Sequence, residues 1–475
     1  AFNNACDMDG ILDVLRHGFK HRGIPFRVCY FMPESSLNQT DAENYKKNIF
    51  HCIRQWHYSP KNKNSVDMML AVNGIPLVAI ELKDQLTGQT VDNAITQWMT
   101  DRDPREDAFQ FNRRILIYFA VDLYRVAMTT RLQGTKTWFL PFNQGSNGPG
   151  VDGGAGNPQN AAGSYVTSYL WEDVLQKDRF LDILQKFISY QKETKKTIMP
   201  DGKTQINITE KLIFPRYHQL DVVRKLVQHT KDNGPGHNYL IQHSAGSGKS
   251  NSIAWTAYRL ASLHDEQNRA IYSSVIIVTD RKVLDSQLQD TINSFEHQVG
   301  LVEAIDDKKN SRSLAEAIND KKRIIICTIQ KFLFAQKDME KFRGRKFAII
   351  IDEAHSSTAG KSMSKASEML TGMSLKEAAE LDSVYDEMED GQNQLIKAAS
   401  AIRNTRNVSY FAFTATPKKE TMELFGTRTE IGKSYFDKYS MKQAIEERSI
   451  LNPLLCYTSY LDSYRIEKKK DDDTE

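Results

Sequence analysis

The segment His243-Ser244-Ala245-Gly246-Ser247-Gly248-Lys249-Ser250 stands between an apolar run at residues 238–242 and a helical pattern at residues 251–263. A strand, a glycine-containing turn and a helix in this order are typical of a phosphate-binding loop. Backbone N–H groups of such a turn close around phosphate oxygens, and the positive end of the helix favours the anion. The sequence therefore predicts a nucleotide site in an α/β sheet.

The residues of this loop have distinct expected roles. Gly246, Ser247 and Gly248 form the tight turn, Lys249 reaches the β- and γ-phosphates, and Ser250 ligates Mg²⁺. His243 stands where the usual GxxxxGK[ST] pattern has its first glycine. This departure is tolerable because the turn depends on Gly246 and Gly248.

Two further elements fit the same nucleotide site. The apolar run at residues 346–351 ends in Asp352-Glu353-Ala354-His355, so its carboxyl end delivers two carboxylates to the crevice where open α/β sheets bind ligands. Asp352 is expected to hold Mg²⁺ through water, and Glu353 to orient and deprotonate the attacking water. The run at residues 409–413 ends in Thr414-Ala415-Thr416-Pro417, whose hydroxyls could bond His355 and report the state of the γ-phosphate.

Upstream of this site, residues 65–72 and 76–83 form two apolar runs joined through Asn73-Gly74, a strong hairpin signal. A plain two-residue turn would place Asp67 opposite Ile80 and send Asp67 and Glu81 to opposite faces. We predict a one-residue bulge at Gly74-Ile75, which sets Asp67 against Glu81. Strand alternation then puts Lys83 on the same face.

Two carboxylates and an ammonium around one point suit metal-assisted phosphodiester hydrolysis. The carboxylates of Asp67 and Glu81 are hard oxygen ligands for Mg²⁺, and Lys83 can position a water or stabilise developing charge. The alternative from spacing alone is a neighbour ion pair of Glu81 and Lys83 at a strand end, with Asp67 as a cap.

Composition sets wider limits. The 475 residues carry 63 basic and 60 acidic side chains, so the formal charge of +3 neither indicates nor excludes nucleic acid. The five cysteines show no CxxC pair, which favours reduced thiols in a cytoplasmic protein. No apolar run reaches the roughly 18 residues that a membrane span needs, so we expect no membrane partner.

Composition also divides the chain. The glycine-rich residues 143–164 are predicted to be a loop, either a solvated connector or a functional loop near DNA. Residues 169–191 show a helical pattern, and the polar residues 192–205 are interpreted as a linker. We expect one domain at 1–205 and a second at 206–455, with a helical insertion at about 356–404 in the second.

The motifs in the second domain resemble those of superfamily 2 helicases and translocases of the DEAH type, which have a RecA-like, doubly wound parallel sheet. Pro215-Arg216-Tyr217-His218-Gln219 is similar to the adenine-reading motif of that family, with Gln219 as the base contact. Thr279-Asp280-Arg281 with Leu284 and Gln287, and Thr328-Ile329-Gln330-Lys331-Phe332, resemble segments that grip the DNA backbone.

The first domain resembles the mixed-sheet PD-(D/E)xK nuclease core, and NGIPLVAIELK at residues 73–83 is very similar to the R subunit of type I restriction enzymes. In that family a glutamine and a tyrosine follow on the next helix. Gln97 fits, but Asp101 stands where the tyrosine would be. Residues 139–143, 154–158 and 439–446 also look like that family.

The resemblance implies an ATP- and Mg²⁺-dependent endonuclease and translocase that cuts double-stranded DNA remotely from its recognition site. It implies methylation and specificity subunits as partners, with S-adenosylmethionine used through them. It also implies a second motor lobe, of which residues 456–475 would begin the connection, and hence weak or absent ATP turnover by these 475 residues alone. The alternative is an ATP-switched DNA clamp, or a helicase, with an inactive nuclease-like domain.

Overall fold

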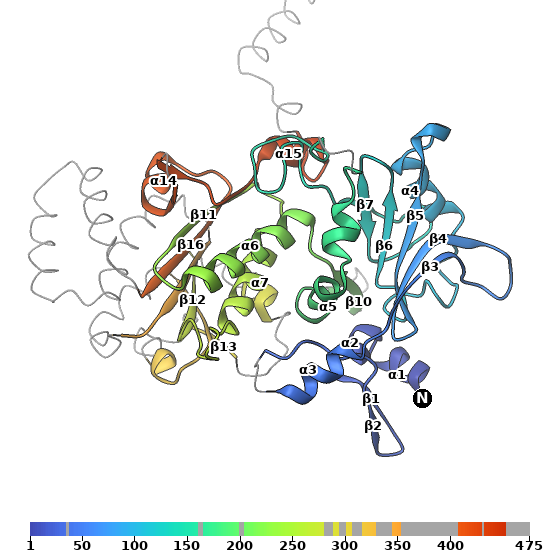
Figure 1. The fold of residues 1–475 in the computed structure, drawn as a ribbon, viewed down its shortest axis with the longest axis horizontal. Helices are drawn as coiled ribbons and strands as arrows, with labels where there is room; N and C mark the ends of the chain where they lie inside the picture. The colour runs from blue at the N-terminus through green and yellow to red at the C-terminus, as the bar shows by residue number, and fades with distance from the viewer. Residues whose placement is uncertain are drawn as a thin grey trace, which may run out of the picture.

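The computed structural model of the chain describes residues 1–34, 38–159, 165–198, 204–279, 288–293, 301–305, 316–328, 344–352, 407–429 and 432–452. Two large sheets organise these residues (Figure 1). The predicted insertion at 356–404 and the segment 456–475 lie outside the described residues. Within the described part, no helix is long and apolar enough to cross a membrane.

The carboxyl-terminal sheet is parallel throughout, as the strand and helix alternation predicted. Its order is β13-β14-β12-β15-β16-β11-β19. The strands are β11 (Asn238–His243), β12 (Ser274–Thr279), β13 (Val302–Ala304), β14 (Ile324–Thr328), β15 (Phe347–Asp352), β16 (Val408–Thr414) and β19 (Asp437–Tyr439). Strands β12, β15 and β16 are buried along their whole length, which is why their sequences are continuous apolar runs without alternation.

Helices connect and cover this sheet. They are α6 (Tyr217–Asn233), α7 (Lys249–Ala261), α14 (Lys419–Phe425) and α15 (Met441–Glu446), and a small hairpin is formed by β17 (Thr427–Thr429) and β18 (Gly432–Ser434). Helices α6 and α7 lie side by side in front of the sheet in Figure 1. Helix α7 starts directly on the phosphate-loop segment, two residues earlier than the sequence pattern indicates.

The amino-terminal sheet is mixed, with the order β3-β4-β5-β6-β7-β8. Its strands are β3 (Phe50–His57), β4 (Ser65–Val72), β5 (Ile75–Leu82), β6 (Ile117–Val121), β7 (Val126–Thr129) and β8 (Leu140–Pro141). Only β5 and β6 pair in parallel, and helix α4 (Val91–Thr100) makes the crossover between them. Shorter elements precede this sheet: α1 (Phe2–Met8), α2 (Ile11–His17), β1 (Phe19–His21), β2 (Ile24–Phe26) and α3 (Gln39–Lys46).

The β4–β5 hairpin has the predicted register near Asp67, but the bulge that produces this register lies away from the predicted place at the turn. Val72 pairs with Ile75 across a plain Asn73-Gly74 turn, whose residues have φ of 50° and 80°. The register shifts between Leu70 and Ala71, so the extra residue is Leu77 rather than one at the turn. An Asn-Gly pair already satisfies the two positive φ values of a tight turn, so the turn itself has no need of a bulge.

Of two predictions for the region between the sheets, one is confirmed in part and the other is wrong. The helical pattern at residues 169–191 is interrupted: a π-helical turn, Leu170–Val174, precedes α5 (Lys177–Lys186). The described residues of the expected linker, 192–198 and 204–205, belong to the antiparallel strands β9 (Ser189–Ile198) and β10 (Thr204–Ile213). Polar strands of a two-stranded ribbon lack the apolar alternation that sequence patterns depend on.

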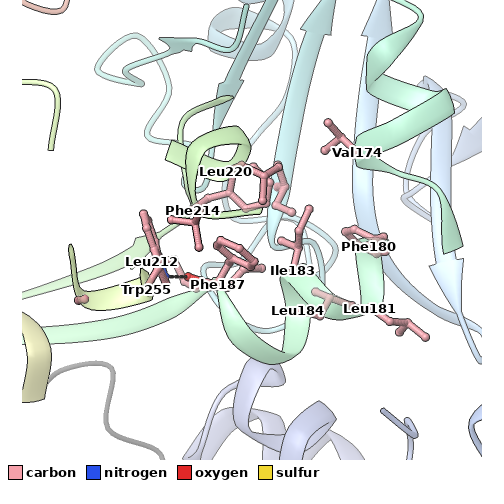
Figure 2. Packing of buried hydrophobic residues seen from close by; sticks show 14 of the residues in the cluster. Val174, Phe180, Leu181, Ile183, Leu184, Phe187, Leu212, Phe214, Leu220 and Trp255 are labelled. Carbon is pink, nitrogen blue, oxygen red and sulfur yellow. Dashed lines mark hydrogen bonds between the residues drawn. The ribbon is translucent and has the colours of Figure 1, made fainter. Parts of the chain in front are cut away.

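One cluster of buried apolar side chains continues from the amino-terminal sheet to the carboxyl-terminal one. Figure 2 shows its middle, where Phe187 of the segment after α5 meets Trp255 of α7. Trp255 is 1% exposed and its indole N–H donates to the carbonyl of Phe187 at 2.8 Å. The two sheets are therefore connected by packed helical segments as well as by the covalent backbone.

The described part of the glycine-rich segment, residues 143–159, docks on the carboxyl-terminal sheet. The backbone N–H of Lys438 in β19 donates to the carbonyl of Gly150 at 2.9 Å, and the Ser440 hydroxyl donates to the carbonyl of Gly153 at 3.2 Å. The N–H of Ala155 donates to a Glu446 carboxylate oxygen on α15. The segment is thus a packed contact between the two halves instead of a free connector.

Candidate functional site

The first candidate site lies where β4 and β5 face each other. Continuing the register of Met68 with Ile80 sets Asp67 opposite Glu81, so both carboxylates share the face that α4 covers. Asp67 is half-buried, and one of its carboxylate oxygens, Oδ2, accepts the backbone N–H of Leu82 at 2.8 Å. Glu81 is fully buried. The bulge at Leu77 is therefore what brings the two predicted ligands together.

Arg102 binds the buried carboxylate. Its Nε and Nη2 donate to Glu81 Oε1 at 2.9 and 2.6 Å, and Nη2 also donates to the carbonyl of Ser65 at 2.9 Å. Arg102 is itself only 6% exposed. The other oxygen, Glu81 Oε2, is buried without a hydrogen-bond partner among the described residues.

Burial raises the pKa of Glu81 to about 7. The Arg102 guanidinium lowers this pKa, whereas the negative charge of Asp67 raises it. Desolvation is the largest of these effects. A further cation bound beside Glu81 would therefore lower this pKa and favour the charged carboxylate.

Gln97, the glutamine that the family resemblance indicated on the next helix, contacts Lys83 in the structure. The Lys83 ammonium donates to Gln97 Oε1 at 2.5 Å. Helix α4 therefore holds the ammonium group that accompanies the carboxylates of Asp67 and Glu81. Asp101 ends α4 and accepts the Thr100 hydroxyl at 2.7 Å. Its neighbour Arg102, rather than Asp101, enters the site.

The donor set fits a divalent cation held largely by water and substrate. No group of three or more His, Cys, Asp or Glu side chains with metal-ligand spacing occurs among the described residues. Mg²⁺ typically uses one or two carboxylates and keeps several waters. The two carboxylates match this need, and one of them has an oxygen with no hydrogen-bond partner within the described ranges.

The second candidate site is the loop between β11 and α7. Gly246 and Gly248 have φ of 73° and 82°, the left-handed region that favours glycine. A Cβ at Gly248 would collide with the Gln219 amide. Lys249 and Ser250 open the helix and are partly exposed, as a phosphate and Mg²⁺ site requires.

The first turn of α6 holds this loop. Gln219 donates through Nε2 to the carbonyls of Ser247 and Gly248, at 3.2 and 2.9 Å, and accepts the Arg216 N–H at 2.8 Å. His218 Nε2 lies 3.1 Å from the carbonyl of Ser247. In this structure the Gln219 amide bonds to the backbone of the loop, and the contact of Gln219 with adenine stays a prediction.

His243, the departure from the usual pattern, has a structural partner. Its Nε2 lies 3.0 Å from Asp437 Oδ1, and both side chains are buried. Strand β19 pairs with β11 through Tyr439, whose ring stacks on that of His218 at 3.7 Å. A glycine at position 243 would leave this space empty.

Three adjacent strands bring the other predicted residues to the same edge. Asp352 ends β15 beside Phe413 of β16, and Thr414 ends β16 beside Gln242 of β11. The N–H of Thr416 donates to the Thr414 hydroxyl at 3.3 Å. Glu353 and His355 lie outside the described residues, as do Asp280 to Gln287 and Ile329 to Phe332 of the predicted DNA segments.

Sequence reasoning missed several residues of both sites. They are Gln55, Ser65 and Arg102 around the carboxylates, and Arg216, His218 and Asp437 around the loop. Arg216 and His218 lie in the motif at residues 215–219. Arg102 directly follows Asp101, where this sequence departs from the family pattern. Gln55 and Asp437 carry no local signal, because their partners are distant in sequence.

Two family models match the chain. The SWI2/SNF2 ATPase model matches residues 218–475, more than half of the chain. The model for the type I restriction enzyme R protein N terminus matches residues 27–137, which contain Asp67, Glu81 and Lys83. The two matches fall on the two candidate sites.

Curated relatives match both halves at once. The type I restriction enzyme HindI endonuclease subunit of Haemophilus influenzae is 25% identical over 452 residues, covering 91% of this chain and 36% of that protein. The SauCOLORF180P endonuclease subunit of Staphylococcus aureus is 24% identical over 449 residues, covering 93% of this chain and 39% of that protein. The chain thus spans well under half of the length of these relatives.

Solved structures resemble parts of the chain. The Type ISP restriction-modification enzyme LlaBIII bound to DNA is 17% identical with a TM-score of 0.31, covering 52% of this chain and 16% of that one. The UvsW helicase from Bacteriophage T4 is 15% identical with a TM-score of 0.28, covering 46% and 60%. On the two family matches and the curated relatives, the chain belongs to the SWI2/SNF2 ATPase family, in the form found with the amino-terminal domain of type I restriction enzyme R proteins.

Proposed function

We propose that the amino-terminal residues, to about 205, form a PD-(D/E)xK nuclease domain that cuts double-stranded DNA with Mg²⁺. The observation that carries this proposal is the register of Met68 with Ile80, which sets Asp67 opposite Glu81 on one face, beside Lys83 held by Gln97. A bound Mg²⁺ would neutralise charge at the scissile phosphate and would lower the pKa of a water bound to it. Asp67 and Glu81 would hold the ion, and Lys83 would position the attacking water.

Residues from about 206 to 455 form, in this proposal, the first RecA-like lobe of an ATP-driven motor. Lys249 contacts the β- and γ-phosphates, Ser250 and Asp352 hold Mg²⁺, and Glu353 activates the water. Thr414, Thr416 and His355 sense the γ-phosphate. The support is the order of β15, β16 and β11, which gathers the ends of these motifs at one edge of the sheet.

The whole protein would act as a subunit of a type I restriction-modification system in the cytoplasm. It would translocate double-stranded DNA and cut away from the recognition site, with methylation and specificity subunits as partners and S-adenosylmethionine bound through them. This part of the proposal rests on the relatives, whose names include endonuclease subunits of such enzymes.

A second candidate is an ATP-switched DNA clamp, or a helicase, whose nuclease-like domain is inactive. The observation that favours it is the ion pair of Arg102 with Glu81, because a buried guanidinium can replace a metal ion as the counter-charge of that carboxylate.

Glu81→Ala and Lys83→Ala in the assembled enzyme separate the two candidates. Both variants should retain DNA-stimulated ATP hydrolysis and lose cleavage of circular DNA by at least about 100-fold, because the residues act only in the chemical step. Lys249→Ala should lose both activities and serves as the control. Cleavage by Glu81→Ala at the rate of the unchanged enzyme would refute the nuclease assignment.

A further inference from the structure

We propose that Gln55 is a positioning residue of the nuclease centre, whose side-chain amide fixes the Asp67 carboxylate for the divalent ion. The inference rests on the proposed nuclease function and adds a residue that neither the motif nor the family resemblance includes. Gln55 lies on β3, the edge strand next to β4.

The backbone of Gln55 is unusual for its place in the fold. Its φ is 47°, and among the described non-glycine residues with positive φ it alone lies within a strand. The β3–β4 ladder pairs Arg54 with Met68 and Trp56 with Val66, and omits Gln55 and Asp67 between them. A left-handed residue inside a strand is sterically disfavoured and persists only where its surroundings determine it.

The side chain of Gln55 makes two hydrogen bonds at this point. Nε2 donates to Asp67 Oδ1 at 3.0 Å, and Oε1 accepts the Ser65 hydroxyl at 2.8 Å. The carboxylate can only accept, so the amide nitrogen must face Asp67 and the amide oxygen must face Ser65. Both bonds therefore fix one orientation of the amide, and the amide fixes one oxygen of Asp67.

Ser65 links this arrangement to the second carboxylate. Its carbonyl accepts Arg102 Nη2 at 2.9 Å, and the same Nη2 binds Glu81 Oε1 at 2.6 Å. Hydrogen bonds thus run from Asp67 through Gln55, Ser65 and Arg102 to Glu81. The spacing of the two carboxylates is set by this network as well as by the β4–β5 register.

Without the amide, Asp67 would keep the bond from the Leu82 N–H to Oδ2 but would lose the amide donor at Oδ1. The carboxylate could then rotate away from the ion. Removing a hydrogen-bond partner of a metal ligand typically weakens metal affinity about 10- to 100-fold. Gln55 is exposed, so its substitution creates no cavity in the core.

Two substitutions separate the amide from the backbone. Gln55→Gly removes the amide but adopts the left-handed conformation freely, and Gln55→Ala removes the amide and keeps the strain. Mn²⁺ binding to the nucleotide-free chain is measured by titration, and the Mg²⁺ dependence of cleavage is measured in the assembled enzyme. Glu81→Ala marks loss of the site, and His51→Ala controls for changes on the same exposed strand.

The expected result is Mn²⁺ binding about 10-fold weaker in both Gln55 variants, with a matching rise in the Mg²⁺ concentration needed for cleavage. ATP hydrolysis should not change, and Tm should fall for Gln55→Ala but not for Gln55→Gly. Unchanged metal dependence in Gln55→Gly, while Glu81→Ala loses the metal, would overturn the role of Gln55. Mn²⁺ binding retained by Glu81→Ala would instead overturn the metal centre itself, and the role of Gln55 with it.

Discussion

Glu81 is a buried carboxylate with one oxygen bound by a guanidinium, and its other oxygen has no hydrogen-bond partner in the part of the chain that the structure describes. Burial of an ion is costly unless it is paired, and Arg102 supplies the pairing. Strand alternation put Glu81 and Lys83 on one face, a predicted bulge added Asp67 to it, and the family resemblance indicated Gln97. Arg102 could not be identified from the sequence, because its contact with Glu81 depends on how the chain leaves α4.

Replacing Arg102 with methionine should destabilise the chain by about 3–5 kcal/mol at pH 8, because a charged Glu81 would be left buried without its partner. Without the guanidinium, the pKa of Glu81 rises above its value of about 7, which already exceeds the ordinary value of 4.5. A raised folded-state pKa means that stability is lost as pH rises through it. The loss of Tm should therefore be larger at pH 8 than at pH 5, as measured by thermal unfolding.

Arg105→Met is the matched control. Arg105 is 89% exposed and pairs with Asp103 in the same loop, so its removal should leave Tm nearly unchanged at both pH values. An equal effect of the two substitutions would mean that the Arg102 ion pair contributes no more than a surface pair.

At the scale of elements, the glycine-rich segment at residues 143–159 differs most from its sequence expectation. Its composition predicted a loop, and the structure shows a loop, but one that bonds to β19 and α15. Gly150 has φ of 74°, and a Cβ there would collide with Asp437 Oδ2. Glycine at this position thus allows the close approach of the Asp437 carboxylate as well as a turn.

Gly150→Ala should release this segment from β19. Alanine at positive φ costs about 1 kcal/mol, and the collision with Asp437 adds to that cost. Faster amide exchange at residues 145–159 and 437–446, compared with the unchanged chain, is the expected measurement.

Gly148→Ala provides a control with the same backbone demand. Gly148 has φ of 96°, and a Cβ there would meet no described atom within 4 Å. It should lower Tm slightly without raising exchange in β19 or α15. Equal exchange in both variants would contradict a specific contact at Gly150.

At the scale of the whole molecule, charges are buried where the two halves meet. The Lys225 ammonium on α6 lies 2.5 Å from Asp221 and 3.7 Å from Asp437, and donates to the carbonyl of Pro149 at 2.9 Å. Asp437 also contacts His243 at the start of the phosphate loop. One lysine therefore joins the glycine-rich segment, α6 and β19.

Stability should depend on pH through this cluster. Burial, and then the charge of Asp437, raise the pKa of Asp221 to about 7, although Lys225 lowers it. Because the unfolded carboxyl ionises near its ordinary value of 3.8, its contribution to stability is lost as pH rises from about 4 to 7. Asp221→Asn removes the ionisation, so Tm of the variant relative to the unchanged chain should be higher at pH 8 than at pH 5.

Asp232→Asn, at an exposed position on the same helix, controls for removal of a negative charge from α6. The same difference between variant and unchanged chain at both pH values would contradict the expected role of Asp221.

The sequence by itself determined the parallel sheet with its phosphate loop, because apolar runs and glycine turns are local signals. It also determined the Asn73-Gly74 hairpin, whereas the facing of Asp67 and Glu81 followed from a bulge that the sequence placed at the turn. Only the tertiary structure decided that Leu77 carries the bulge, that residues 189–198 pair with 204–213, and that Gln55 and Arg102 hold the carboxylates. Those features depend on which distant groups meet, and burial and hydrogen-bond satisfaction select them after the elements have formed.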